Sequence, residues 1–191
     1  MLYIVAGIVA LGSFLIPRAI DMFQLQADGI RHLAQDVERY HNNTRSMEGD
    51  YTVTIDLSNP ESNEGKVLFD GEEGDQIYIS RIVQSSSSYI VVFRSSGSYN
   101  LGGGTLVSGL EHARNKNGFT HEFKAKAQAS YNGETYKLKP SSSSGLNYRS
   151  GDEFGFYLFS PDEEIDITKE QTIEVTITNL QLNIWAEKVN H

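Results

Sequence analysis

The first seventeen residues, Met1 to Pro17, contain no charged side chain, and the first charge in the chain is Arg18. Every residue in this run is apolar, small or hydroxylated. Exposure of such a run is unfavourable, because apolar surface is stabilised by its removal from water. We therefore expect the run to be buried in a bilayer, in a partner or in copies of the same chain.

The length of this run makes it a marginal membrane span. A helix over residues 1–16 would be about 24 Å long, whereas the hydrocarbon core of a bilayer is about 30 Å thick. A secretory signal peptide is the second interpretation, but such peptides carry a basic segment first, and no basic residue precedes Arg18. A third interpretation is that a short charged leader has been removed and that Met1 begins the mature chain.

Beyond Pro17, apolar residues recur at alternating spacings of three and four, which predicts one apolar stripe on a helix that continues to about His41. The stripe, which we expect to pack on the globular domain, consists of Ile20, Phe23, Ala27, Ile30, Ala34 and Val37. Pro17 lies inside this helical pattern, where it removes a backbone hydrogen bond and should kink the helix. The sequence thus predicts a long N-terminal helix, kinked near Pro17, within residues 1–44.

From residue 50 the apolar period changes to two. Residues 51–57 and 119–129 alternate apolar and polar side chains, as strands with one buried face do. Shorter strands are expected at residues 66–69, 76–83, 89–94, 105–110, 134–139, 154–159, 172–180 and 182–185. Asn132-Gly133 predicts a tight hairpin turn, because both residues readily adopt left-handed backbone conformations. These features predict an antiparallel β-sandwich or Greek-key head over residues 45–191, and hence an α+β fold class.

The composition excludes several classes of function. The formal net charge is -9, so nucleic acid is not an expected partner, because phosphate binding needs clustered Lys and Arg. The chain has no cysteine, which excludes disulfides and thiol chemistry. Asn42-Asn43-Thr44 is a glycosylation sequon, so Asn42 is a candidate for N-linked modification, with an unmodified turn as the alternative.

No catalytic motif is recognisable in the chain. The sequence has no HExxH, no GxSxG and no glycine-rich loop followed by Lys and Ser or Thr. We therefore expect neither enzymatic activity nor a cofactor. Asp70, Glu72, Glu73 and Asp75 could offer oxygen ligands to calcium, although they do not match the usual calcium-loop pattern and a solvated acidic turn is the alternative.

The uncharged N-terminal run, the proline within the helical pattern, the amphipathic continuation and the β-rich remainder together resemble the type IV pilin superfamily. The resemblance is one of architecture, and it rests on residues 1–41 and on the β-rich part of the chain. Mature bacterial pilins usually carry a glutamate at the fifth position, where this sequence has Val5. The chain is therefore more similar to the archaeal branch, the pilins and archaellins, in which that glutamate is commonly missing.

This resemblance implies a structural subunit of an extracellular, cell-surface helical filament used in adhesion or motility. It also implies a precursor held in the membrane before assembly, a leader cut off by a prepilin-type peptidase just before Met1, and an assembly machinery that builds a homopolymer. The filament core would consist of Leu2, Ile4, Val5, Ile8, Val9, Leu11, Phe14, Leu15 and Ile16.

The alternative function is that of a single-pass anchored β-sandwich that binds a carbohydrate, calcium or a protein and does not polymerise. A conventional anchor has about twenty apolar residues and basic residues at its cytoplasmic end. Here the run is shorter, and its first charge, Arg18, lies on the domain side. This difference favours the filament subunit.

Overall fold

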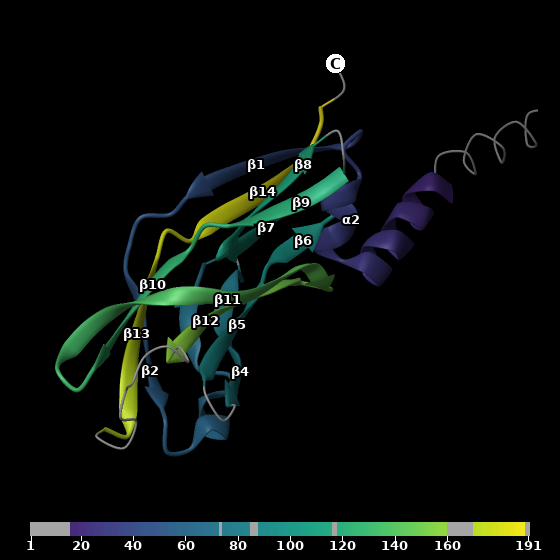
Figure 1. Ribbon diagram of the computed structural model, residues 1–191. Coiled ribbons are helices and arrows are strands. Elements are labelled where there is room, and N and C mark those ends of the chain that lie inside the picture. Colours follow the sequence, from purple (N-terminus) through teal and green to yellow (C-terminus); the bar gives the residue numbers. More distant parts are fainter. Residues whose placement is uncertain (1–15, 73, 85–87, 116–117, 160–169, 190–191) are drawn as a thin grey trace, which may run out of the picture.

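The computed structural model describes residues 16–72, 74–84, 88–115, 118–159 and 170–189. The chain is mostly β, with 62% strand and 15% helix. The helical parts are residues 16–28 and α2 (Ile30–Gln35), and a short 3-10 turn, η1, spans Pro60–Asn63. Figure 1 shows the helical segment 16–28, in purple, extending away from a body of strands.

The strands account for most of the described residues. They are β1 (Tyr40–Ser46), β2 (Tyr51–Asp56), β3 (Val67–Asp70), β4 (Gln76–Gln84), β5 (Tyr89–Ser96), β6 (Ser98–Asn100), β7 (Gly103–Ser108), β8 (Leu110–Asn115), β9 (Gly118–Phe123), β10 (Lys126–Tyr131), β11 (Glu134–Tyr148), β12 (Gly151–Phe159), β13 (Thr172–Thr178) and β14 (Gln181–Glu187). Every pairing between these strands is antiparallel.

The strands form one large sheet and two smaller units. Eight strands in the order β2-β13-β10-β11-β12-β5-β4-β3 make a nearly closed, barrel-like sheet. The strands β1, β14, β7 and β6 form a second sheet, and β8 and β9 pair as a separate ladder. Because β13 and β14 follow each other in the chain but belong to different sheets, they connect the two sheets directly (Figure 1).

The main core lies inside the barrel-like sheet. In β13 the odd-numbered residues from Ile173 to Ile177 are buried and the even-numbered ones are more exposed, as the strand period of two requires. The rings of Phe93 and Phe154 are fully buried and stack with their centroids 5.6 Å apart. Burial of one such side chain stabilises the fold by about 1.5–3 kcal/mol.

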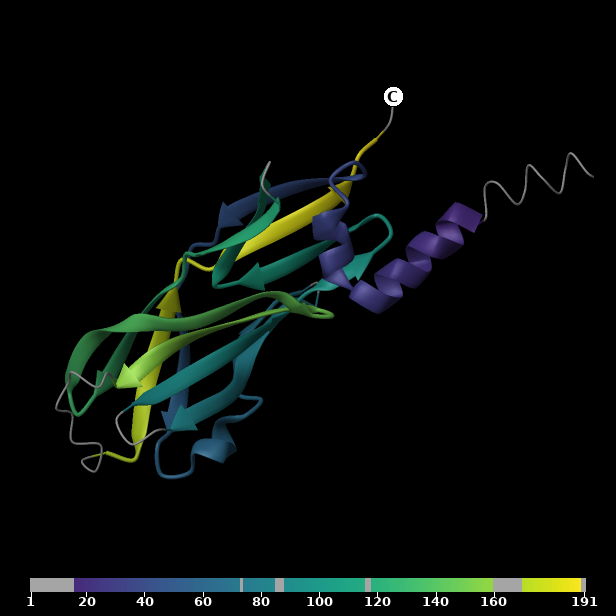
Figure 2. The same cartoon turned by 45° about the vertical axis from the view of Figure 1, so that its right-hand side comes forward.

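A second, smaller core lies between α2 and the four-stranded sheet. Its members are Leu25, Ile30, Leu33, Ala34, Tyr40, Leu106, Leu146 and Trp185. Figure 2 shows α2 lying against the strands at one end of the molecule. The hydroxyl of Tyr40 donates to the carbonyl oxygen of Leu101 over 2.9 Å, so the first residue of β1 is fixed in this core by both its ring and its hydroxyl.

The predicted α+β fold with a long N-terminal helix is wrong. The helix stops at Gly29, whose φ of +61° is left-handed, and it resumes only as the short α2. The residues around His41, predicted to be helical, form β1 and pair with β14. The pairing of β1 with β14 along its whole length outweighs the helical spacing of the apolar residues, because intrinsic propensities contribute less free energy than tertiary contacts. The head is a nearly closed sheet with a second sheet beside it, in place of the expected sandwich.

Several strand predictions are confirmed. The predicted strand at residues 51–57 is β2. The hairpin at Asn132-Gly133 joins β10 to β11, with φ values of 51° and 75°, and Tyr131 pairs with Glu134 across it. The predicted strand at residues 119–129 differs, because it divides into β9 and β10. At the division, the N–H groups of Lys124 and Ala125 both donate to the carbonyl oxygen of Gly109 at 3.0 Å.

Strand β11 continues through Pro140 and the serines after it, beyond the end of the predicted strand at residues 134–139. It pairs with β10 as far as Leu138 and with β12 from Lys139 onwards. Its register shifts between Pro140 and Ser143, as expected where a proline without an N–H interrupts the ladder. The first part of β11 therefore pairs with β10, and the rest of the strand pairs with β12.

The junction at Gly29 generates a prediction about stability. A Cβ added at Gly29 would lie 1.8 Å from the carbonyl oxygen of Arg149, whereas Gly65, with a φ of +80°, has no atom within 4 Å of such a Cβ. We expect Gly29→Ala to lower the free energy of unfolding by about 2–4 kcal/mol, and the control Gly65→Ala by about 1 kcal/mol, because only the first adds a collision to the backbone strain. Chemical denaturation measures both values, and equal losses would show that the contact with Arg149 has no cost.

Candidate functional site

The helical segment 16–28 presents large apolar side chains to solvent. Phe23 is 75% exposed, and Ile16, Ile20 and Met22 are each more than half exposed. Three of these residues share one helical face with Ala27, because they are spaced by four, three and four residues. We call this face the outer stripe: it consists of Ile16, Ile20, Phe23 and Ala27.

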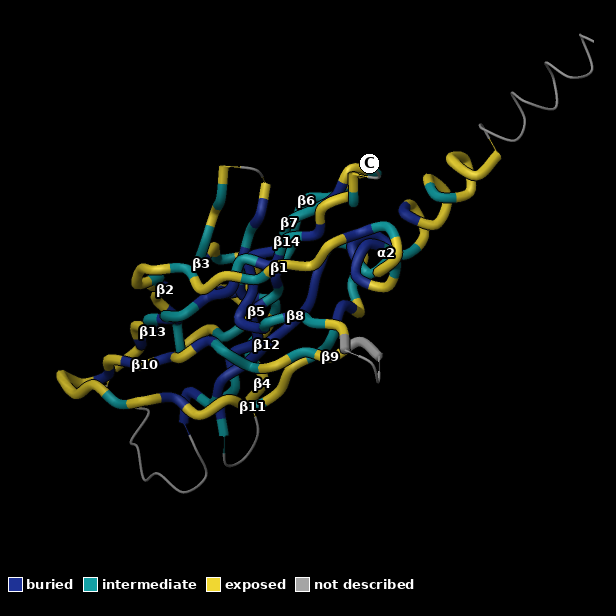
Figure 3. The backbone as a smooth tube through the Cα atoms, turned by 90° about the horizontal axis from the view of Figure 1, so that it is seen from above, coloured by how far each residue is buried: buried dark blue, intermediate teal, exposed yellow. Residues whose placement is uncertain are grey.

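The opposite face of the same segment contacts the domain. Leu25, which is only 7% exposed, belongs to the smaller core with Ile30 and Leu33. Asp21, one turn earlier, forms an ion pair with Arg39. At about 100° per residue, positions 21 and 25 lie roughly half a turn from the outer stripe. The outer stripe therefore points away from the domain, and Figure 3 shows this segment as mostly exposed.

The predicted packing of the helix on the domain needs correction. Ile30 and Ala34 are buried as predicted, whereas Ile20, Phe23, Ala27 and Val37 are exposed. The left-handed Gly29 separates residues 16–28 from α2, so the two halves of the predicted stripe no longer share a face. Leu25 and Leu33, which the spacing did not select, make the contact instead.

Most of the predicted filament-core residues lie outside the described residues. These are Leu2, Ile4, Val5, Ile8, Val9, Leu11, Phe14 and Leu15. Ile16, the last of that set, is exposed at the beginning of the described helix. Pro17 is itself helical, and the turn before it, where a kink would occur, also lies outside the described residues.

Arg39 connects the projecting helix to the end of the second sheet. Its guanidinium pairs with Asp21 of the helix and, at 3.0 Å, with Glu187 of β14. Burial acts to lower the pKa of Arg39, but the hydrogen bonds to Asp21 and Glu187 outweigh it and raise that pKa. Beside it, Lys188 Nζ donates to the carbonyl oxygen of Val37 over 2.6 Å. The ion pairs of Arg39 and the burial of Leu25 fix the orientation of the helical segment 16–28 relative to the domain.

Ser108, His112 and Asp152 form a fully buried polar cluster between the two sheets. Ser108 Oγ donates to both carboxylate oxygens of Asp152, over 2.9 and 2.7 Å, and His112 Nε2 lies 2.5 Å from Asp152 Oδ2. These are the residue types of a hydrolytic triad, but here the serine bonds the carboxylate and not the histidine. A nucleophile needs a base at its hydroxyl and access to a substrate. We therefore interpret Ser108, His112 and Asp152 as a group that joins the two sheets by hydrogen bonds.

Asn183 and Asn42 extend this cluster to β1. Asn183 Oδ1 accepts hydrogen bonds from the N–H of His112, over 2.8 Å, and from Thr44 Oγ1, over 3.0 Å. With its amide oriented to match its neighbours, Asn42 donates to the carbonyl oxygen of His112 and accepts from the indole N–H of Trp185, both over 3.0 Å. Asn42, the candidate for glycosylation, therefore lies in β1 and not in the expected turn. Its side chain connects β1 to β8 and β14.

The structure does not bring the calcium candidates together. Asp70 and Glu72 are exposed, and Glu73 lies outside the described residues. Asp75 is buried and accepts a hydrogen bond from Thr105 Oγ1 over 2.7 Å. Within the described part of the chain, no group of three or more His, Cys, Asp or Glu could hold a metal ion.

Glu153 on β12 is the centre of a charged cluster that the sequence did not indicate. Its carboxylate accepts hydrogen bonds from Arg94 Nη2 (2.6 Å), Arg81 Nη1 (3.0 Å) and Ser80 Oγ (2.7 Å). The guanidinium of Arg94 also lies 3.9 Å from the centre of the Tyr148 ring. Burial acts to raise the pKa of Glu153, but the hydrogen bonds from Ser80 and its other neighbours outweigh it and lower that pKa below its ordinary value.

No helix in the described ranges is both long enough and apolar enough to cross a membrane. Comparisons of the chain with protein-family models, with curated proteins and with solved structures found no match.

Glu153 should make the stability of the chain depend on pH. Because its pKa is lowered in the folded chain, its contribution is present above the pKa of the unfolded chain and is lost as the pH falls through the folded-state value. We expect Glu153→Gln to lower the free energy of unfolding at neutral pH by about 1.5–3 kcal/mol. The remaining loss of stability between about pH 5 and pH 2 should become shallower.

Urea unfolding across this pH range measures both effects. Glu174→Gln is the matched control, because Glu174 is exposed on β13 and makes no ion pair with another described residue. This control should leave the stability and its pH profile unchanged. A pH profile of Glu153→Gln identical to that of the unmodified chain would show that the cluster does not stabilise the fold.

Proposed function

We propose that this chain is the structural subunit of an extracellular helical filament, similar to a type IV pilus, used in adhesion or motility and assembled through its N-terminal apolar segment. The observation that supports this proposal most strongly is the direction of the outer stripe. The stripe continues the uncharged run of residues 1–17 and points away from the domain of its own chain.

Among the described residues, the two hydrophobic cores take little from the projecting helical segment. Both hydrophobic cores are filled by other side chains, and of the segment 16–28 only Leu25 contributes to one of them. Each Å² of apolar surface left in water costs about 25 cal/mol relative to burial. A partner that covers the uncharged run and the outer stripe together would recover this free energy, and a second copy of the chain offers the same apolar surface.

Side-by-side packing of this segment favours an open polymer. When one surface of a chain contacts a different surface of the next, the contact does not close on itself and a helical filament results. Small residues within the run would let neighbouring backbones approach closely; they are Ala6, Gly7, Ala10, Gly12 and Ser13. In this proposal the segment is held in the membrane before assembly, and a prepilin-type peptidase and an assembly machinery act on the precursor.

The second candidate is a membrane-anchored binding module that does not polymerise. A hollow on the outer face of the barrel-like sheet, lined by Lys126, Lys137 and other residues, favours a binding role of this kind. In that case the uncharged run would remain in the bilayer, and the outer stripe would lie at its surface. The short run and the position of Arg18 on the domain side make the filament the preferred proposal.

Phe23 provides the sharpest test of assembly. Phe23→Asp places a charge at the most exposed position of the outer stripe, and we expect filament yield to fall at least about tenfold, because an unpaired carboxylate is costly to bury. Gln26→Asp adds the same charge at an exposed position of the same helix but outside the stripe, and should leave the yield unchanged. Electron microscopy of filaments sheared from cells measures the yield, and thermal unfolding reports whether the domain remains folded.

Ile8→Asp repeats this test within the uncharged run. It should abolish assembly, because an unpaired carboxylate is costly to bury between chains, and thermal unfolding reports whether the domain remains folded. Filament yields equal to the unmodified chain in both Phe23→Asp and Ile8→Asp would contradict the proposal. Recovery of the unmodified chain only in the membrane fraction, without filaments, would support the anchored module instead.

A further inference from the structure

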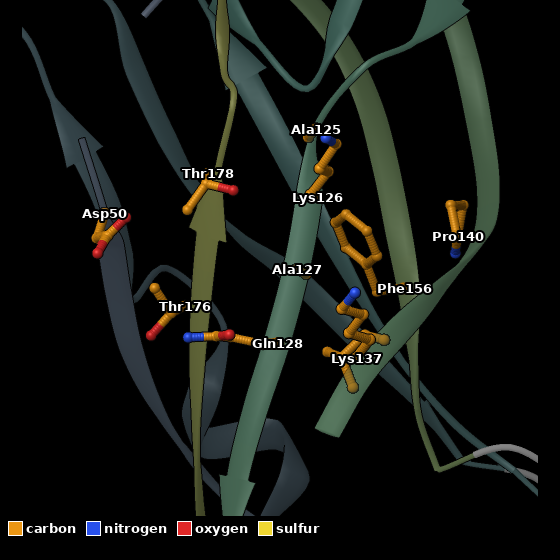
Figure 4. A pocket seen from close by; sticks show the side chains of 11 residues that line it. Asp50, Ala125, Lys126, Ala127, Gln128, Lys137, Pro140, Phe156, Thr176 and Thr178 are labelled. Atoms are coloured by element: carbon orange, nitrogen blue, oxygen red, sulfur yellow. The ribbon is translucent and has the colours of Figure 1, made fainter. Parts of the chain in front are cut away.

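A hollow of about 590 Å³ opens on the outer face of the barrel-like sheet, where β11 leaves β10 (Figure 4). Its floor is apolar and includes Ala127, Leu138 and Phe156. Its rim is polar and includes Asp50, Lys126, Gln128, Lys137, Thr176 and Thr178. Small-molecule sites have volumes of about 300–1,000 Å³ and combine an apolar lining with a few polar groups, so this hollow has the size and composition of such a site.

The change of partner by β11 explains why the hollow exists. Strand β11 pairs with β10 only as far as Leu138, and Pro140, which has no N–H, already pairs with Phe156 on β12. On the other side, the chain before β10 turns away, because the N–H groups of Lys124 and Ala125 donate to Gly109. The two strands therefore separate, and Figure 4 shows the ring of Phe156 in the gap between them.

Strand register places the polar rim. Gln128 pairs with Lys137 on β11 and with Thr176 on β13, and Lys126 pairs with Thr178. These side chains share the outer face, because they alternate with buried residues of the same strands. Lys126 and Lys137 are diagonal neighbours on adjacent strands, a relation that places Cβ atoms within about 8 Å. Both ammonium groups can therefore reach one ligand.

The two lysines at the rim share the hollow with one carboxylate, that of Asp50. Neither forms an ion pair with another described residue, whereas Lys124 pairs with Glu111 at 3.3 Å and with Glu122 at 2.8 Å. The chain as a whole carries a net charge of -9. The lining of the hollow therefore has two positive charges and one negative charge, a local positive excess in an acidic chain, and this excess favours an anionic group on the ligand.

We propose that this hollow binds an acidic saccharide, meaning a sugar residue that carries a carboxylate, as a uronic acid does. Lys126 and Lys137 would bind the carboxylate, and the side chains of Gln128, Thr176 and Thr178 would bind sugar hydroxyls. The exposed ring of Pro140 at the rim offers an apolar surface to the carbon-bound hydrogens of the sugar. The inference does not depend on filament assembly, because every residue that carries it belongs to the barrel-like sheet.

Calorimetric titration of the full chain in neutral detergent tests this proposal. The probes are a galacturonic acid trimer and a galactose trimer of the same linkage, which differ only in the carboxylates. We expect binding of the acidic trimer, at least about tenfold weaker binding after Lys126→Ala or Lys137→Ala, and still weaker binding in the double variant. Arg45→Ala is the matched control, because it removes the same charge from an exposed position on β1 and should not change the affinity.

Four results would overturn the proposal: no binding of the acidic trimer, equal affinity for the galactose trimer, equal weakening by Arg45→Ala, or full displacement of the acidic trimer by an equal concentration of inorganic sulfate. Both lysines are exposed, so their replacement should not unfold the sheet. Filament counts for the double variant should equal those of the unmodified chain, which separates this test from the test of assembly.

Discussion

The joining of the two sheets depends on the buried carboxylate of Asp152. It lies on β12 of the barrel-like sheet, accepts hydrogen bonds from Ser108 on β7 of the second sheet, and contacts His112 on β8. A carboxylate removed from water is costly unless it is hydrogen-bonded or paired. Three separate elements must therefore be in place together before this group is satisfied, which couples the formation of the main core to that of the smaller one.

The polar contacts around Asp152 also extend to strand β1, which follows α2 in the chain. Asn183 connects His112 to Thr44, and Asn42 reaches Trp185, so that β1 is fixed to its neighbours by side chains as well as by its backbone. Strand β1 follows α2 after a short connection, and Arg39 in that connection holds both the helix and β14. The orientation of the apolar segment is thus a property of the whole domain.

The sequence predicted the strands and turns that depend on neighbouring residues. It did not predict the pairings and clusters that depend on residues far apart in the chain. Local alternation predicted β2, and turn chemistry predicted the hairpin at Asn132-Gly133. Strand β1 was missed because its side chains are mostly exposed and do not alternate, and because its partner residues lie near the C-terminus, as in the pairing of Tyr40 with Glu187. The buried group of Ser108 and Asp152 has no spacing motif, since only the packing of two sheets brings the residues together.

Gly29 combines a left-handed backbone with close packing against the carbonyl of Arg149. The space that any other side chain would need at this position is already occupied. Gly29 therefore joins the helical segment 16–28 to the domain in a defined backbone conformation. In a fibre built on that segment, the torsion angles of Gly29, together with the contacts of Arg39 and Leu25, would set the tilt of every domain relative to the fibre axis.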